Sequence, residues 1–85
     1  MNGSTDTRVA VISIIVEEPS CVPAINDILH DAADAIIGRM GIPYREKNIS
    51  IISVVMDAEL DVINQASGKL GRIDGATVKT AYSKN

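Results

Sequence analysis

The stretch VISIIVE at residues 11–17 recurs, residue type for residue type, as IISVVMD at residues 51–57. Both copies are rich in β-branched residues, which favour strands. Each copy ends in an acidic residue and leads into a segment whose apolar residues follow helical spacing. A strand–helix unit written twice in 85 residues predicts a βαββαβ sandwich, because two right-handed βαβ halves combine into one antiparallel sheet.

The segments around the two copies complete this pattern. Strands are expected at residues 8–16, 39–44, 49–56 and 76–82, and the second is assigned to an edge because it contains Gly41 and Pro43. The first helix is expected to begin at a Ser20 N-cap, to hold Pro23 in its first turn and to end at Gly38. The second is expected to run from an Asp57 N-cap to Gly71. An Asp74-Gly75 turn precedes the last strand.

The predicted fold class is therefore α+β. We expect a ferredoxin-like sandwich whose four-stranded antiparallel sheet has the order 4-1-3-2, with both helices on one face. Residues 1–7 are assigned to a flexible tail and residues 8–83 to a single domain.

Composition limits how such a chain can be stabilised and what it can bind. The chain is 46% hydrophobic but has only two aromatic residues, Tyr44 and Tyr82, so the core must be aliphatic. A core of this size usually supplies about 3–5 kcal/mol. Cys21 is the only cysteine, which excludes an internal disulfide and leaves oligomerisation as the common reinforcement.

Charge and hydropathy exclude two classes of partner. A net charge of −3 with scattered basic residues leaves no footprint for direct nucleic-acid binding. The longest apolar run, residues 9–16, is far shorter than a membrane span. A polar N-terminus and a lone free cysteine predict a cytoplasmic protein.

Alternation along the two central strands predicts an apolar surface that no part of the chain covers. The even-numbered residues, 10–16 and 50–56, are expected to face the helices. A one-sided antiparallel sheet normally has a polar outer face, yet the odd-numbered residues are nearly as apolar as the even ones. We predict a homodimer or homotetramer in which these odd-numbered residues form the interface; the alternative is a monomer with an apolar surface. The interface residues are Val9, Val11, Ser13, Ile15, Ile49, Ile51, Ser53 and Val55.

Candidate ligand-binding residues come from a glycine-rich run at residues 68–75 and from the edge strand. Three glycines with Lys69 and Arg72 could cradle an anion, but phosphate loops open a helix and this run closes one, where the helix dipole favours cations. The alternative is a helix end and a turn, with Gly68 at a close helix–sheet contact. Basic residues of the edge strand could line a pocket between subunits or simply protect the edge. The candidates are Gly68, Lys69, Gly71, Arg72, Arg39 and Arg45.

No catalytic set or metal site is predicted. His30 stands beside Asp27, Asp31 and Asp34 at helical spacing, but a transition-metal site needs several His or Cys ligands. A solvated acidic helix face is the better interpretation of these residues. Cys21 has no second histidine to activate it and is interpreted as a small core residue. The residues point to no particular cofactor.

The chain resembles the small bacterial proteins of the iron-only hydrogenase system regulator family from about Arg8 to Lys84. The resemblance is carried by GIPYREKN at residues 41–48 and by SGKLG at 67–71 with GATVKT at 75–80. It implies a stand-alone ACT-like domain, similar in fold to the C-terminal domain of nickel-responsive repressors, with subunits joined through their sheets. Two features depart from those relatives: residues 17–20 lack the glycine of amino-acid-binding ACT loops, and the chain has one His and one Cys where a nickel site needs several.

The resemblance implies a non-enzymatic regulator of transcription or of an enzyme system, which senses a small effector or docks on a protein. The chain lacks a recognisable DNA-reading motif, so a partner would supply any DNA contact. The alternatives are a structural adaptor without a ligand and a small ferredoxin-like enzyme of the dimeric α/β-barrel kind.

Overall fold

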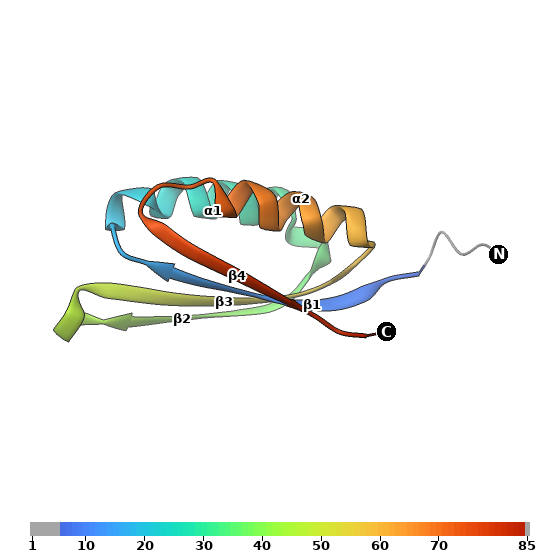
Figure 1. The fold of residues 1–85 in the computed structure, drawn as a ribbon, viewed down its shortest axis with the longest axis horizontal. Coiled ribbons are helices and arrows are strands. Elements are labelled where there is room, and N and C mark those ends of the chain that lie inside the picture. The colour runs from blue at the N-terminus through green and yellow to red at the C-terminus, as the bar shows by residue number, and fades with distance from the viewer. Residues whose placement is uncertain (1–5, 85) are drawn as a thin grey trace.

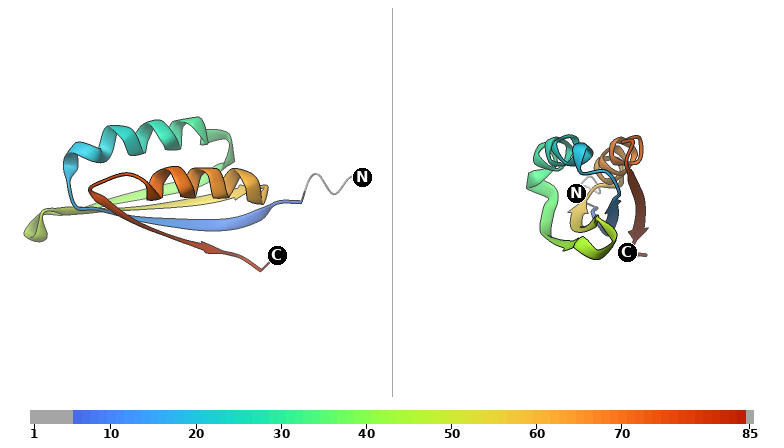
Figure 2. Two further views of the ribbon diagram at one scale, coloured as in Figure 1. Left: turned by 45° about the horizontal axis from the view of Figure 1, so that its top comes forward. Right: turned by 90° about the vertical axis from the view of Figure 1, so that its left-hand side faces the viewer.

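A computed structural model describes residues 6–84. The strands are β1 (Arg8–Val16), β2 (Ile36–Tyr44), β3 (Ile49–Ala58) and β4 (Ala76–Tyr82), and the helices are α1 (Val22–Asp31) and α2 (Leu60–Gly71). Three short 3-10 turns accompany them: η2 (Pro19–Cys21), η3 (Ala33–Ala35) and η4 (Arg45–Lys47). The sheet has the order β2-β3-β1-β4, with every neighbouring pair antiparallel. Both helices cover one face of it (Figures 1 and 2). The predicted sandwich and strand order are confirmed.

The two copies of the repeated stretch lie side by side at the centre of the sheet. Ser13 of β1 stands opposite Ser53 of β3, and Ile15 stands opposite Ile51. An approximate two-fold axis therefore passes between the two serines and exchanges the copies. The register is strongly specified, because a slip of one residue would turn every side chain of a strand to the other face.

The core lies between this strand pair and the helices. All the even-numbered central positions are buried as predicted, apart from Ser50, which is half-buried. Most of them pack against Ile25 and Leu29 of α1 and against Ala66 and Leu70 of α2. Ala10 instead packs with Ala58 and with Ile63 of α2. Burying an aliphatic side chain of this kind contributes about 1.5–3 kcal/mol. The buried strand residues are Ala10, Ile12, Ile14, Val16, Ile52, Val54 and Met56.

Both predicted ends of the first helix are wrong. The N-cap of α1 is Cys21, preceded by the η2 turn, and no side-chain hydrogen bond from Ser20 caps it. The helix ends at Asp31 rather than Gly38. Ile36 has the spacing of the next helical core position, but it begins β2 opposite Met56 and still packs on the core. Strand pairing and core contact are both satisfied there, so the sheet prevails over helical spacing. Pro23 lies in the first turn, as predicted.

The second and third strands in the chain, β2 and β3, are also longer than predicted. β2 begins at Ile36, with a register irregularity between Ile36 and Gly38. β3 continues to Ala58, because β1 begins at Arg8 and gives Ala58 a partner. The N-cap of α2 is consequently Glu59, and the prediction that Asp57 caps this helix is wrong. The end of α2 at Gly71 and the bounds of β4 agree with the sequence prediction.

The β2–β3 hairpin projects from one end of the molecule. With η4 at its tip, it extends past the helices (Figure 1). At the start of the chain, residues 1–5 of the predicted tail lie outside the described residues, and β1 begins at Arg8. Within residues 6–84, neither helix has the length and apolarity needed to cross a bilayer.

Gly75 joins the loop after β1 to the loop before β4. Its carbonyl oxygen accepts hydrogen bonds from the backbone N–H groups of Glu17 and Glu18, at 2.8 and 3.0 Å. Its φ of +94° lies in the region that favours glycine. A Cβ atom at this position would stand 2.9 Å from the Cβ of Glu18, which the backbone holds in place.

Replacing Gly75 with alanine should therefore destabilise the protein by more than about 1 kcal/mol, because the backbone strain and the clash act together. Urea unfolding followed by circular dichroism measures the change. An unfolding midpoint equal to that of the wild type would show that position 75 accommodates a Cβ atom without strain or clash.

Candidate functional site

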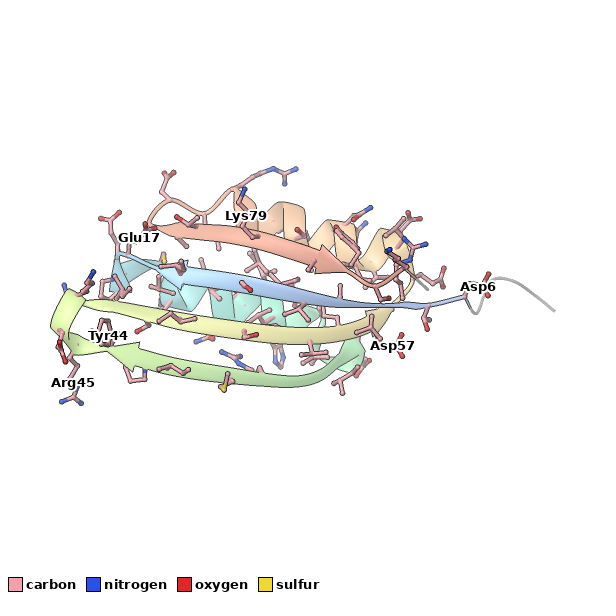
Figure 3. All side chains as sticks on the ribbon, turned by 60° about the horizontal axis from the view of Figure 1, so that its bottom comes forward. Asp6, Glu17, Tyr44, Arg45, Asp57 and Lys79 are labelled. Atoms are coloured by element: carbon pink, nitrogen blue, oxygen red, sulfur yellow. The ribbon has the colours of Figure 1, made fainter. Side chains whose placement is uncertain are left out.

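The sheet surface opposite the helices is not covered by any element of the described residues, and we call it the outer face (Figure 3). All eight predicted interface residues lie on it, in register across the strands. β2 extends it with large side chains that the sequence prediction did not include: Met40 opposite Ser53, Ile42 opposite Ile51, and Tyr44 opposite Ile49. On the other side, β4 contributes Thr77, Lys79 and Ala81. Among the described residues, no helix or turn packs over this face.

The outer face is apolar along its middle and on its β2 side. Ile15 is 39% exposed and Met40 is 57% exposed. From strand rise and spacing, the face measures roughly 25 Å by 15 Å, a projected area of about 400 Å². This area includes the β4 side with Thr77 and Lys79, so the apolar patch over β1, β2 and β3 is smaller. Patches of a few hundred Å² are among the largest that soluble proteins expose, and they are often functional.

Charged groups lie at the margins of the outer face. Glu17 stands at one end and Asp57 at the other, while Lys79 lies on the outer strand β4 (Figure 3). Glu17 is held there by the Thr77 hydroxyl, which donates to its Oε1 at 3.0 Å. The centre carries only the Ser13–Ser53 pair among aliphatic side chains. This pattern of an apolar centre and a polar rim is that of a protein interface.

The predicted ligand-binding residues do not come together in one place. Gly68, Lys69 and Arg72 line a shallow depression of about 510 Å³ on the exposed side of α2, whereas Gly71 does not. The remaining lining residues are Asp61, Asn64 and Gln65, all from the same helix and all polar. This depression is a helix surface without an apolar floor, and such a surface offers little to a small molecule.

The alternative interpretation of Gly68, a close helix–sheet contact, is wrong. An added Cβ atom there would meet no atom within 4 Å. Gly68 lies on the open side of α2, while the contact between α2 and β4 is made by the neighbouring Ser67, whose hydroxyl lies 2.7 Å from that of Thr80.

Arg39 and Arg45 line two separate depressions on the helix side of β2. Arg45 lines a small one of about 130 Å³ with Pro43 and Tyr44. Arg39 lines a larger one of about 530 Å³ between α1 and β2. Five of the six candidates thus line separate depressions, and Gly71 lines none of them. The Arg39 and Arg45 depressions both have apolar linings, but the Arg39 groove is much the larger of the two. Lys69 also lines a small depression of about 90 Å³ between the two helices, with Ile28 and Val62.

The loop after β1 cannot bind an anion through its backbone. The N–H groups of Glu17 and Glu18 are already donated to the carbonyl of Gly75. The two carboxylates would also repel a negative charge placed there. The physical arrangement therefore agrees with the absence of the glycine that amino-acid-binding loops carry at this place.

Residues 6–84 contain no group of three His, Cys, Asp or Glu side chains that could hold a metal ion. His30 is exposed on α1 and lines the Arg39 groove. Cys21 is a buried free cysteine in the core cluster.

The family of the chain follows from a comparison with known proteins. Residues 8–80 match the model of the family described as "TM1266-like: Iron-only hydrogenase system regulator, putative". The chain belongs to this family. The resemblance seen in the sequence is confirmed, and so is the coarse assignment as a regulator by family name. No curated protein matches the chain.

One solved structure supports the same assignment, and a second shares the fold. An uncharacterized protein from Thermotoga maritima, TM1266, is 36% identical, with a TM-score of 0.87 over 93% of this chain and 100% of its own. The C-terminal domain of the MgtC protein from Mycobacterium tuberculosis has a TM-score of 0.65 over 100% of this chain and 95% of its own. At 10% identity, that second likeness concerns the fold alone.

If Gly68 is only part of an open helix surface, Gly68→Ala should stabilise the protein by about 0.5–1 kcal/mol, since alanine costs less backbone entropy in a helix. Urea unfolding again measures the change. A loss of stability would contradict this interpretation and would mean that the missing side chain accommodates a contact.

Proposed function

We propose that the chain is a non-enzymatic regulatory module that works as a homodimer or homotetramer assembled through its outer face. In this proposal the assembled module docks on a protein partner or responds to a small effector. The observation that carries it is the apolar outer face, which no part of residues 6–84 covers. The proposal places the protein in the cytoplasm, where a lone reduced thiol such as Cys21 is stable.

A second copy is the best occupant of the outer face for three reasons. The apolar centre gains free energy on burial, at about 25 cal/mol per Å² removed from water. The charged groups Glu17, Asp57 and Lys79 lie at the margins, where they stay hydrated when the centre is covered. A small aliphatic core benefits from the added stability, because binding to the folded state alone shifts the folding equilibrium.

The residues of the outer face and of the depressions favour a regulatory role over an enzymatic one. The outer face offers Ser13 and Ser53 as its central polar groups, with Lys79 of the edge strand β4 opposite Ser13 and Met40 of β2 opposite Ser53. This row holds no carboxylate or histidine. The depressions described above are open and shallow, whereas an active site that excludes water is enclosed. The second candidate is an adaptor that binds no ligand. It is favoured by the α2 depression, which is lined by polar residues and glycine and has no apolar residue at its base.

In this proposal the chain itself does not contact DNA, and a partner protein makes any such contact. Within residues 6–84, both helices pack on the sheet through their apolar sides, and neither is arranged as a recognition helix. A regulator built this way acts by changing the assembly or activity of another protein.

Charge placed in the centre of the outer face should break the assembly. We expect wild type to elute as a dimer or larger species in size-exclusion chromatography with light scattering at micromolar concentration, and Ile15→Asp to elute as a monomer. The matched control is Val62→Asp on α2, because Val62 and Ile15 are almost equally exposed, at 41% and 39%. Val62→Asp should leave the assembly unchanged.

Two results would contradict the proposal. One is a monomeric wild type at micromolar concentration. The other is equal dissociation by both substitutions, which would mean that the oligomer forms through a different surface.

A further inference from the structure

The groove between α1 and β2, which we call the α1–β2 groove, combines a cation and an apolar lining with a volume of about 530 Å³. Its apolar lining comes from Leu29, Ala33 and Ile36, and its polar lining includes Asn26, His30 and Arg39. Leu29 is fully buried and Ile36 is half-buried, so the floor belongs to the core rather than to mobile surface side chains. A concave apolar floor with a few polar groups at its rim is the usual form of a small-molecule site.

The groove exists because α1 does not cover β2. Arg39 stands opposite Val54 and Gly41 opposite Ile52, so both positions face the helix side of the sheet. Gly41 has no side chain, and a Cβ atom there would meet nothing within 4 Å. The space beside α1 therefore stays open over the inner side of the edge strand.

Arg39 carries a positioned charge that the protein does not neutralise. Its Nη2 atom donates a hydrogen bond to Oδ1 of Asn26, at 3.2 Å, which ties β2 to α1 across the groove. Asn26 is neutral, and no carboxylate of the described chain lies within ion-pair distance of the guanidinium. The fork of an arginine has five N–H donors, so most of them remain available for an incoming acceptor.

We propose that the α1–β2 groove binds a small organic monoanion, a carboxylate with a short apolar body. The carboxylate accepts hydrogen bonds from the Arg39 guanidinium, and the body lies on Ala33 and Ile36, next to the buried Leu29. Charge-assisted pairs of this geometry are among the stronger hydrogen bonds in proteins. The inference deepens the effector branch of the proposed function and rests on it for its regulatory meaning.

Asp27 sets the charge of the ligand. It lines the same groove, and its carboxylate repels a second negative charge brought close to it. A single carboxylate placed at Arg39 keeps its charge at one end of the groove, whereas a compact dianion lacks an apolar part to hold it there. The groove therefore favours a carboxylate over a free phosphate.

A titration of the whole chain with hexanoate tests the proposal. We expect saturable NMR shifts of the Leu29 and Ile36 methyl groups with hexanoate, and clearly weaker binding of hexanol and of inorganic phosphate. Arg39→Gln should weaken hexanoate binding about tenfold or more. Asp27→Asn should strengthen it. Arg72→Gln, which removes a cation from the α2 depression, is the matched control and should leave the affinity unchanged.

Three outcomes would overturn the proposal. The first is a set of shifts that do not saturate with hexanoate. The second is an Arg39→Gln variant that is folded by circular dichroism and binds hexanoate as tightly as wild type. The third is equal affinity of the wild type for hexanoate and for hexanol or phosphate.

Light scattering on the same samples separates this site from the oligomer. If the protein is an oligomer that binds no hexanoate, only the proposed binding site is contradicted. If it is a monomer that binds hexanoate, only the proposed assembly is contradicted.

Discussion

The pairing of β1 with β3 is the interaction on which the rest of the structure depends. Because Ser13 stands opposite Ser53, the inward residues of both strands face the helices together and the outward residues face away together. The pair is central in the sheet, so its register also determines which residues of β2 and β4 lie on each face. A single geometric choice thus creates both the core and the outer face.

The two faces of this strand pair are completed differently. The inner face is filled by α1 and α2, whose Leu29 and Leu70 are almost entirely buried. The outer face is as rich in β-branched side chains as the inner face, but no element of the described chain packs on it. Since the helices cover the central strands, the edge strand β2 also keeps an open inner side. The outer face is open because both helices lie on the other face of the sheet. The α1–β2 groove is open because the helices do not reach over the edge strand.

The sequence alone predicted the features that depend on repetition and alternation. The repeated stretch determined the fold, the strand order and the eight outer residues, because period-two alternation leaves little choice once the strands are known. Prediction from the sequence failed where one residue fits two patterns. Ile36 has helical spacing and strand character at once, and only its partner Met56 on β3 shows which applies. Asp57 resembles an N-cap, but pairing opposite Val9 keeps it in the strand.

The candidate sites were predicted less well, for a physical reason. Met40 and Ile42 join the outer face only because β2 lies beside β3 in a register that sequence spacing does not specify. The link between Arg39 and Asn26 joins residues of different elements, which sequence spacing does not bring together. The glycine and arginine residues of the sequence could suggest a ligand site. They could not show that the surface of α2 lacks apolar lining residues while the groove beside α1 has them.

The central claim, that a second copy covers the outer face, is tested most directly by solvent accessibility in solution. A soluble paramagnetic probe broadens the methyl signals that it can reach. The account predicts that the methyl groups of Val11, Ile15, Ile51 and Val55 are protected, while those of Leu60 and Val62 on α2 are broadened. Equal broadening of both sets at micromolar to millimolar protein would show that the outer face is free in water, and it would contradict the account.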